Sequence, residues 1–296
     1  MLDETVRSLT VDGQQFAYRV LRHPSPRTHP MVLLGGVFQG IHDWCPVERE
    51  LMPVADVVTL DYPGSHNPMP VEDLSPALLC RALALVVDDL GADRINLFGY
   101  SYGSIIAHRY AVEHPERVAR LVLGGVPTGV TPAQRLRVEE AKALAAAGRV
   151  EEFASLATEL MLCMGPEMPL VHRRLASRYL RRSVLRQLRT PHALAVLQRT
   201  FDVTVAVGAS DLDGIPTLVF SGAHDTLCPV AQQRAFAATL AEGSFAVLES
   251  SDHWVVFARP AEVAALALRH FTEDLTPSVR PSVLALTGTR EGPSDG

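Results

Sequence analysis

Short apolar runs alternate with longer amphipathic segments along most of the chain. Apolar runs of about four residues are typical of strands that are buried on both faces of a sheet, and we expect them at residues 31–34, 57–60, 95–98, 121–123, 217–220 and 245–248. Helical periodicity is clearest at residues 76–90, 102–114, 231–240 and 260–271. This repetition of strand and helix predicts an α/β fold with a mostly parallel sheet and helices on both faces.

The two ends of the chain depart from that pattern. Alternating runs at residues 6–11 and 15–21, joined by Asp12 and Gly13, predict a β-hairpin. Residues 276–296 are rich in Pro, Ser, Thr and Gly, a composition that predicts a flexible C-terminal tail.

One long segment lacks any strand signal. Residues 131–207 show only helical periodicity rich in Ala, Leu and Arg, and the segment is too long for a loop in a compact domain. We interpret it as a helical cap, or lid, inserted into a core formed by residues 1–130 and 208–275. Caps over the carboxyl edge of a sheet often shape the substrate pocket and exclude water, although a purely structural helical subdomain would give the same pattern.

A glycine-bordered turn follows the strand expected at residues 95–98. Residues 99–103 read Gly-Tyr-Ser-Tyr-Gly and lead into a helical pattern. A sharp strand-to-helix turn requires glycines on both sides of its centre, because the central residue is strained and neighbouring side chains would clash. We therefore expect Ser101 to project as an exposed hydroxyl. An ordinary glycine-bordered turn is the alternative for this motif taken alone.

Two later loops supply the partners that a serine nucleophile needs. A hydroxyl requires a base to take its proton and a third group to orient that base. Asp225 follows one predicted strand and His253 follows the next, so both lie at the carboxyl edge of the sheet. Asp211 and Asp213 precede their strand and would point to the opposite edge. The sequence therefore predicts Ser101, Asp225 and His253 as catalytic residues.

The motif and the chain order Ser101, Asp225, His253 resemble those of the α/β-hydrolase superfamily, in particular its members with a helical cap. The resemblance extends from the opening hairpin to the final helix. It implies an α/β-hydrolase fold and a Ser-His-Asp mechanism with no cofactor. Relatives by fold that hydrolyse epoxides or remove halogens use an aspartate at the turn, so Ser101 argues against those activities.

The resemblance also indicates donors for the oxyanion that forms during acyl transfer, each contributing roughly 3 to 4 kcal/mol. The first is the backbone N–H of Tyr102. The second lies in the loop after residues 31–34, where the family often has His-Gly-x; matching by position puts Gly35 in place of the histidine and makes Val37 the donor. A backbone donor survives that change, but an anchoring side chain is lost. Residues 60–65 resemble a shortened Asp-x-x-Gly turn with a structural role.

Candidate substrate-binding residues flank these groups. Phe38 lies beside the oxyanion donor and Trp254 beside His253, and we expect both to face the cavity. The cap offers an apolar set that could hold an acyl chain or could simply pack the cap onto the sheet: Leu160, Met161, Leu162, Met164, Tyr179 and Leu180.

The composition and net charge of the chain argue against a nucleic-acid-binding protein and against a membrane protein. The chain has 296 residues, of which 47% are hydrophobic and 20% charged, as is ordinary for a soluble globular enzyme. A net charge of −6 argues against a nucleic-acid partner. No apolar run approaches the ~20 residues of a bilayer span, and the acidic start lacks a signal core, so we expect a cytoplasmic protein with no membrane partner.

The four cysteines and a cluster of arginines are further candidates for binding a metal or a ligand. No Cys-x-x-Cys pair occurs, and we expect the four cysteines to be buried thiols rather than metal ligands: Cys45, Cys80, Cys163 and Cys228. Arginines crowd into the predicted cap, which indicates either a solvated helix face or a landing site for an anionic carrier such as a phosphopantetheine arm or its carrier protein: Arg173, Arg174, Arg178, Arg181, Arg182, Arg186 and Arg189.

These observations predict a serine hydrolase that cleaves an ester or thioester through an acyl-enzyme. Residues 31–40, 61–68 and 98–104 are weakly similar to segments of acyltransferases and thioesterases that handle 3-hydroxyacyl thioesters. Transfer of a carrier-bound or coenzyme-A-bound acyl group is therefore one alternative. Hydrolysis of a carbon–carbon bond in a diketone uses the same triad. A non-hydrolytic cyclase or binding protein with a relic triad is the third alternative.

Overall fold

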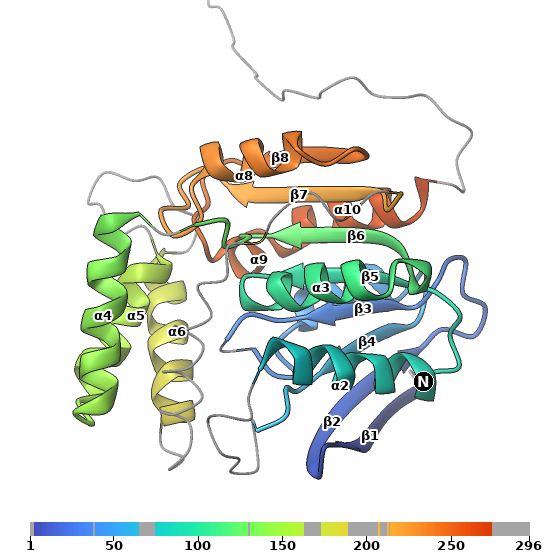
Figure 1. The fold of residues 1–296 in the computed structure, drawn as a ribbon, viewed down its shortest axis with the longest axis horizontal. Coiled ribbons are helices and arrows are strands. Elements are labelled where there is room, and N and C mark those ends of the chain that lie inside the picture. The colour runs from blue at the N-terminus through green and yellow to red at the C-terminus, as the bar shows by residue number, and fades with distance from the viewer. Residues whose placement is uncertain are drawn as a thin grey trace, which may run out of the picture.

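The computed structural model of the 296-residue chain is an open sheet with helices on both faces (Figure 1). The structure describes residues 3–37, 39–64, 75–129, 131–162, 173–188, 207, 212 and 214–273. Of the sequence predictions, Phe38, the tail at 276–296 and much of the second half of the cap lie outside the described residues.

Eight strands form the sheet among the described residues, in the order β1-β2-β4-β3-β5-β6-β7-β8. β1 pairs with β2 and β2 with β4 in antiparallel fashion, and all other pairs are parallel. The strands are β1 (Asp3–Val11), β2 (Gln14–Arg22), β3 (Met31–Leu34), β4 (Val57–Leu60), β5 (Ile95–Tyr100), β6 (Val118–Gly124), β7 (Thr217–Gly222) and β8 (Gly243–Leu248). The hairpin and the mostly parallel sheet are both confirmed.

Side chains alternate between the two faces, as the period of a strand requires. Along β3, Val32 and Leu34 belong to the apolar cluster on one face, whereas Met31 and Leu33 belong to the cluster on the other. The first face is covered by α2 (Pro76–Asp89), α3 (Tyr102–Glu113) and α8 (Val230–Ala238); the second is covered by α1 (Cys45–Leu51), α9 (Val255–Ala258) and α10 (Pro260–Phe271).

Two parts of the sheet differ from the expectation. β8 was expected to be buried on both faces, but only its last residue, Leu248, is buried, and the others are exposed or half-buried. The reason is that β8 pairs only with β7 and forms the edge of the described sheet. β5 continues two residues further than expected, through Tyr100. The strand-to-helix turn is therefore a single residue, Ser101, and not the whole five-residue motif.

Three helices lie beyond the carboxyl ends of the parallel strands, on the left in Figure 1: α4 (Pro132–Ala146), α5 (Val150–Met161) and α6 (Arg173–Leu188). They share an apolar cluster of their own, which includes Phe153, Leu180 and Val184 together with Trp254 from the loop after β8. All three lie within residues 131–207, where the sequence predicts a helical cap; the bounds of that cap stay a prediction. None of the described helices is both long and apolar enough to cross a bilayer.

Candidate active site

Ser101 occupies the strained turn between β5 and α3. Its backbone angles, φ 52° and ψ −118°, lie outside the usual regions for a residue with a side chain. A Cβ on Gly99 would lie 2.6 Å from the Cβ of Ala107, and one on Gly103 would lie 2.1 Å from the carbonyl oxygen of Leu34. Glycines are thus required on both sides of Ser101, as the sequence predicted, because α3 begins in contact with the end of β3.

Three side chains from three loops meet at this turn. The His253 Nε2 atom lies 2.9 Å from the Ser101 Oγ, and the His253 Nδ1 atom lies 2.8 Å from the Asp225 Oδ2. The parallel strands β5, β7 and β8 end at the same edge of the sheet, which is why residues 28 and 152 positions from His253 reach its ring. The structure therefore brings together the residues expected to form the triad.

Asp225 is held by the backbone of its own turn. Its Oδ1 atom accepts hydrogen bonds from the N–H groups of Leu227, at 2.9 Å, and Cys228, at 2.7 Å. These bonds leave Oδ2 directed at the imidazole. A carboxylate held in this way fixes which ring nitrogen of His253 carries a proton: Nδ1–H donates to Asp225, and Nε2 is left to accept from Ser101.

The electrostatics of the pair favour a basic imidazole. Burial alone lowers the pKa of the His253 ring, but the Asp225 carboxylate, which attracts the imidazolium and accepts a hydrogen bond from it, outweighs that effect and raises this pKa well above the ordinary value. A proton taken from Ser101 during a reaction would therefore be stabilised on the ring.

The backbone around His253 is also fixed. The Tyr100 hydroxyl donates a hydrogen bond to the His253 carbonyl oxygen, and the two rings stack with centroids 5.7 Å apart. Gly125, with φ 58°, lies against the ring edge: a Cβ at this position would be 2.8 Å from the His253 Cε1 atom. β5 and the end of β6 thus hold the histidine that β8 supplies.

The loop after β3 runs beside Ser101. A Cβ built on Gly36 would lie 3.4 Å from the Ser101 Cβ. The Gly36 N–H already donates to the Gln39 Oε1 atom at 2.7 Å, and the Gly35 carbonyl accepts from the Tyr62 hydroxyl at 2.8 Å. Because the Gly36 N–H is occupied, Val37 is the next backbone donor along the loop, as expected. Its role as an oxyanion donor stays a prediction.

Tyr102 stands at the first position of α3, directly after Ser101. Backbone N–H groups in the first turn of a helix carry its positive partial charge, which favours a negatively charged group beside them. This placement fits the oxyanion donor predicted at Tyr102. The Tyr102 side chain packs edge-on against Tyr62, with ring centroids 5.5 Å apart.

Two expectations about exposure are wrong. The Ser101 residue is only 8% exposed, because its hydroxyl is turned toward His253 and the Gly36 backbone lies against its Cβ. Cys45 is exposed rather than buried, since it begins the surface helix α1, whereas Cys80 and Cys228 are buried as expected. Cys163 lies outside the described residues.

Trp254 and most of the apolar residues expected in the cap lie within the described part of the chain, and the binding of substrate by Trp254 stays a prediction. Trp254 is buried and stacks on Phe257 at 4.2 Å between ring centroids, within the cluster of the cap helices. Tyr179 of α6 lies beside both rings, and its hydroxyl donates to the Asp43 Oδ1 atom at 3.1 Å. Met161, Leu162 and Leu180 are buried, and Leu160 packs against them, which is the packing role that the sequence left open. Phe38 and Met164 are outside the described residues.

Sequence reasoning missed three residues that support the site. Gln39 and Tyr62 hold the loop after β3, and Cys228 lies beside the imidazole, where burial raises the pKa of its thiol. Only Tyr62 had a signal, because it belongs to the turn after β4 for which a structural role was expected. In that turn the Asp61 Oδ1 atom accepts the Ile41 N–H at 3.0 Å.

Comparisons with known proteins agree with this architecture. Residues 29–260 match the family model described as the alpha/beta hydrolase fold. An alpha/beta hydrolase enzyme from a Medee basin deep-sea metagenome library superimposes with a TM-score of 0.80 at 17% identity, over 94% of this chain and 100% of that one.

Curated relatives match over shorter stretches. A poly(3-hydroxyalkanoate) depolymerase of Ectopseudomonas oleovorans is 27% identical over 124 residues, 42% of this chain and 44% of the relative. A 2-hydroxy-6-oxononadienedioate/2-hydroxy-6-oxononatrienedioate hydrolase of Dechloromonas aromatica is 31% identical over 105 residues, 33% of this chain and 36% of the relative. The matches thus span less than half the length of these relatives.

Proposed function

The chain belongs to the alpha/beta hydrolase fold family, and we propose that it is a serine hydrolase that cleaves an ester or thioester through an acyl-enzyme. The observation that carries the proposal is the continuous chain of contacts from the Ser101 Oγ through His253 to Asp225, at 2.9 and 2.8 Å. This spacing lies within the range needed for proton transfer between nucleophile and base. Each member comes from a different loop, so their meeting is a property of the fold and not of local sequence.

In the first half-reaction, the Ser101 Oγ attacks the acyl carbonyl carbon while its proton passes to the His253 Nε2 atom. The carbonyl oxygen becomes an oxyanion, which accepts hydrogen bonds from the backbone N–H groups of Val37 and Tyr102. Collapse of this intermediate breaks the bond to the leaving alcohol or thiol, and His253 returns the proton to that group. The acyl group is then bonded to Ser101.

Water completes the cycle by the same route in reverse. His253 takes a proton from the water as its oxygen attacks the acyl-enzyme, and the Ser101 oxygen leaves with that proton. Throughout, the Asp225 carboxylate stabilises the imidazolium and keeps Nε2 directed at the reacting oxygen. The products are the free acid and the regenerated hydroxyl, and no cofactor or metal is needed for these steps.

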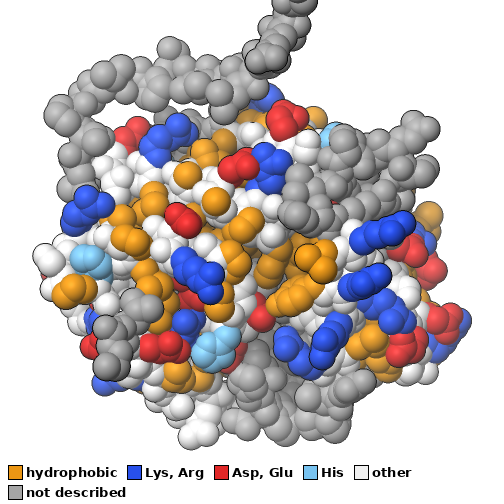
Figure 2. Space-filling model, turned by 180° about the vertical axis from the view of Figure 1, so that it is seen from behind, with side chains coloured by type: hydrophobic (Ala, Val, Ile, Leu, Met, Phe, Trp, Pro, Cys, Tyr) orange, Lys and Arg blue, Asp and Glu red, His pale blue; other side chains and the backbone are white. Residues whose placement is uncertain are grey.

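The exposed arginines of α6 favour one class of substrate, an acyl thioester whose carrier is anionic. On α6, Arg174, Arg178, Arg182 and Arg186 recur every four residues and are all exposed. None of the carboxylates that the structure describes forms an ion pair with these four. Blue side chains gather on the same side of the molecule, at the right in Figure 2. In a chain of net charge −6, this local positive charge supports binding of a phosphorylated carrier such as coenzyme A or a carrier-protein arm.

Hydrolysis of a carbon–carbon bond is the second candidate. Its support is the 31% identity, over 105 residues, to the Dechloromonas aromatica hydrolase named for 2-hydroxy-6-oxononadienedioate and 2-hydroxy-6-oxononatrienedioate. In such a reaction His253 would first move a proton within the substrate, and Ser101 or an activated water would then attack the ketone. Both candidates therefore use the same residues and differ in the bond that breaks.

One substrate panel separates these activities. Purified protein is incubated with nitrophenyl acyl esters, acyl-coenzyme A thioesters and ring-cleavage diketones, with an alcohol added to a parallel series to detect acyl transfer. We expect turnover of the esters or thioesters by wild type and none by Ser101→Ala. Turnover of the diketones alone would replace the proposal by the second candidate. Undiminished turnover by Ser101→Ala would show that Ser101 is not the nucleophile, and no turnover of any substrate by wild type would favour a binding or cyclising role for the pocket.

A further inference from the structure

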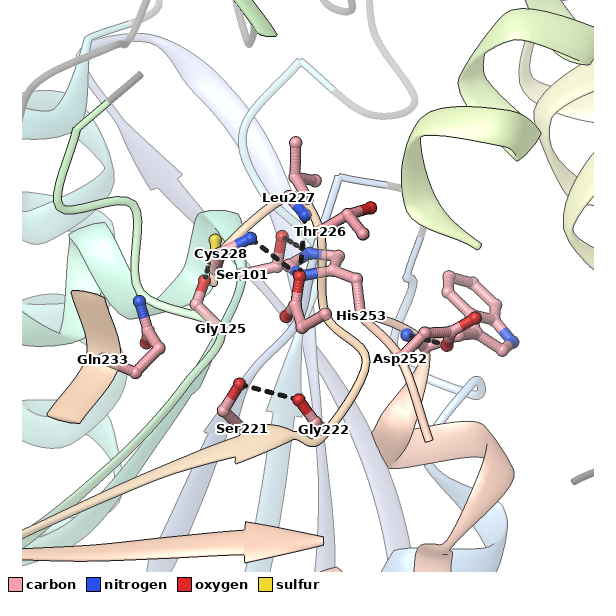
Figure 3. Close-up of polar contacts among 12 residues, drawn as sticks. Ser101, Gly125, Ser221, Gly222, Thr226, Leu227, Cys228, Gln233, Asp252 and His253 are labelled. Atoms are coloured by element: carbon pink, nitrogen blue, oxygen red, sulfur yellow. Dashed lines mark hydrogen bonds and ion pairs between the residues drawn. The ribbon is translucent and has the colours of Figure 1, made fainter. Parts of the chain in front are cut away.

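A third metal-ligating side chain lies beside the imidazole and carboxylate of the active site. A carboxylate oxygen of Asp225, the Sγ atom of Cys228 and a ring nitrogen of His253 all lie within 4.8 Å of one another. In Figure 3 Cys228 lies beside His253, with its thiol directed at the Gly125 carbonyl. The thiol has no part in acyl transfer as derived above, so its presence at this point of the site calls for a separate explanation.

The position of Cys228 is fixed from two sides. Its backbone N–H donates to the Asp225 Oδ1 atom at 2.7 Å, which ties it to the carboxylate. Its thiol donates to the Gly125 carbonyl oxygen at 3.2 Å, and Gly125 lies against the edge of the His253 ring. The three residues Asp225, Cys228 and His253 are only 5%, 4% and 1% exposed. The thiol is therefore a built component of the site and not a mobile surface group.

The donor set has a clear chemical preference. Thiolate sulfur, imidazole nitrogen and carboxylate oxygen together are ligands for Zn²⁺ and similar soft or borderline cations. Ca²⁺ and Mg²⁺ require oxygen ligands and are disfavoured by the sulfur and nitrogen. A divalent cation held by one thiolate and one carboxylate also leaves no net charge in a buried site, which lowers the cost of burial.

We propose that Asp225, Cys228 and His253 bind a soft divalent cation such as Zn²⁺, and that the bound cation inhibits the enzyme. The inhibition, though not the binding, rests on the proposed function. Ligand atoms around zinc stand about 3 to 4 Å apart, since metal–ligand distances are about 2.0 to 2.3 Å. The Nδ1–Oδ2 distance of 2.8 Å must therefore open slightly, and the sulfur must move toward the pair.

Binding redistributes two protons. The Cys228 thiol releases its proton to solvent, and the His253 ring gives up its Nδ1 proton and takes one on Nε2. The cation then holds the thiolate, the carboxylate and Nδ1. With Nε2 protonated, the ring cannot accept the proton of the Ser101 hydroxyl, so the nucleophile is not activated. The cation would thus act as a reversible inhibitor that leaves the substrate-binding surfaces untouched.

The binding test uses untagged, metal-free full-length protein titrated with ZnCl₂ in a calorimeter. We expect one tight site per chain in wild type. In Cys228→Ser, whose hydroxyl can still donate to Gly125, affinity should fall at least as far as the roughly 10- to 100-fold loss that follows removal of a supporting outer-shell group. The matched control is Cys45→Ser, which removes an exposed thiol and should bind as wild type. Equal affinity in Cys228→Ser and wild type would overturn the proposal.

A spectroscopic arm covers the case in which Cys228→Ser folds poorly. CdCl₂ added to wild type should produce a sulfur-to-cadmium charge-transfer band in the ultraviolet, with unchanged intensity in Cys45→Ser and in Ser101→Ala. Absence of the band in wild type would contradict ligation by Cys228. Because Ser101→Ala retains the ligands but lacks the nucleophile, binding is tested even if the proposed hydrolase activity is wrong.

The inhibition is measured on whichever substrate the panel identifies. Turnover by wild type should fall in proportion to occupancy of the zinc site and return when EDTA is added. For Cys228→Ser, rates are expressed relative to that variant without metal, and the inhibition curve should shift to higher zinc concentration. An unshifted curve, or zinc saturation of the calorimetric site without loss of turnover, would refute inhibition through this cluster.

Discussion

At the scale of single residues, Asp225 and His253 each have one atom engaged by a supporting bond and another directed at the next group in the site. Asp225 uses Oδ1 for two backbone N–H groups and Oδ2 for His253. Gln39 uses Oε1 to hold the Gly36 N–H. Such bonds set orientation before a substrate binds, which is how an active site lowers its reorganisation cost. Removing a supporting bond should therefore affect the chemical step more than substrate binding.

Replacing Asp225 by asparagine should nearly abolish turnover. The amide keeps the size of the side chain, but it can donate to Nδ1 and so favours the ring tautomer that has a proton on Nε2. In triads of this type that change lowers kcat by about 10⁴-fold. The measurement is steady-state kinetics on the preferred substrate. Asp252→Asn is the matched control, because Asp252 is also buried but bonds the Trp254 N–H; a loss in Asp252→Asn equal to that in Asp225→Asn would contradict the assignment.

Replacing Gln39 by leucine should lower kcat by about 10- to 100-fold while KM changes little. The Gly36 N–H loses its acceptor, and the adjacent Val37 donor loses its fixed direction; full loss of an oxyanion donor costs about 10²- to 10³-fold. Gln39→Glu retains an acceptor oxygen and should recover part of the rate. If Gln39→Leu raised KM and left kcat unchanged, the side chain would be a substrate contact and not a positioning residue.

At the scale of elements, the junction of β3, β5 and α3 is the tightest part of the site. Gly103 lets the first turn of α3 rest on the end of β3, and this contact places the loop after β3 beside Ser101. The length of β5 and the one-residue turn could not be predicted from the motif, since the two tyrosines suit either a strand or a helix. The requirement for the two glycines could be predicted, because it follows from steric exclusion alone.

Gly103→Ala should destabilise the fold by an amount near the upper end of the roughly 1 to 3 kcal/mol range for overpacking. The added Cβ would meet a backbone carbonyl at 2.1 Å, and backbone moves less readily than a side chain. Urea denaturation followed by circular dichroism gives the free energy of unfolding. Gly129→Ala, where nothing lies within 4 Å of the added atom, should stay within about 0.5 kcal/mol of wild type. Similar losses in both variants would contradict the close approach of α3 to β3.

The arginine stripe on α6 makes a prediction about substrate charge. Arg178→Glu combined with Arg182→Glu should raise KM for an acyl-coenzyme A thioester by about 2- to 30-fold, if each exposed pair contributes about 0.2 to 1 kcal/mol. KM for an uncharged nitrophenyl ester should not change. The control is Arg49→Glu with Arg269→Glu, which changes the net charge equally on the exposed faces of α1 and α10. Equal effects of the two double variants would show that only net charge matters.

At the scale of the whole molecule, the parallel sheet is what assembles the site. Its strands end at one edge, so Ser101, Asp225 and His253 could be matched from sequence by locating strand ends and reading chain order. The supporting contacts of Gln39, Tyr62 and Cys228 could not be found in this way, because they depend on how three loops pack against one another. The burial of Ser101 was missed for the same reason, and the exposure of β8 follows from its place at the edge of the sheet.

A buried histidine far from the active site predicts how the stability of the whole molecule depends on pH. His270 of α10 is bonded through Nε2 to the Pro216 carbonyl oxygen at 3.0 Å, and burial lowers its pKa from 6.5 to about 4. A lowered pKa favours the neutral ring in the folded state. The contribution of His270 to the free energy of unfolding is therefore complete above pH 6.5. It is lost as the pH falls toward 4, which lowers the free energy of unfolding by about 3 kcal/mol.

Urea denaturation at a series of pH values tests this contribution. The free energy of unfolding should decline through that range in wild type, and the decline should be smaller in His270→Gln, which cannot take up a proton. Parallel curves for wild type and His270→Gln would show that other groups cause the acid sensitivity.

The central claim is that the Ser101 hydroxyl is the nucleophile and that His253 activates it. Intact-mass spectrometry after incubation with a fluorophosphonate, followed by peptide mapping, tests this most directly. We predict one adduct per chain, on the peptide that contains Ser101, absent from Ser101→Ala and formed far more slowly in His253→Ala. An adduct on another residue, or equal labelling rates in wild type and His253→Ala, would contradict the account.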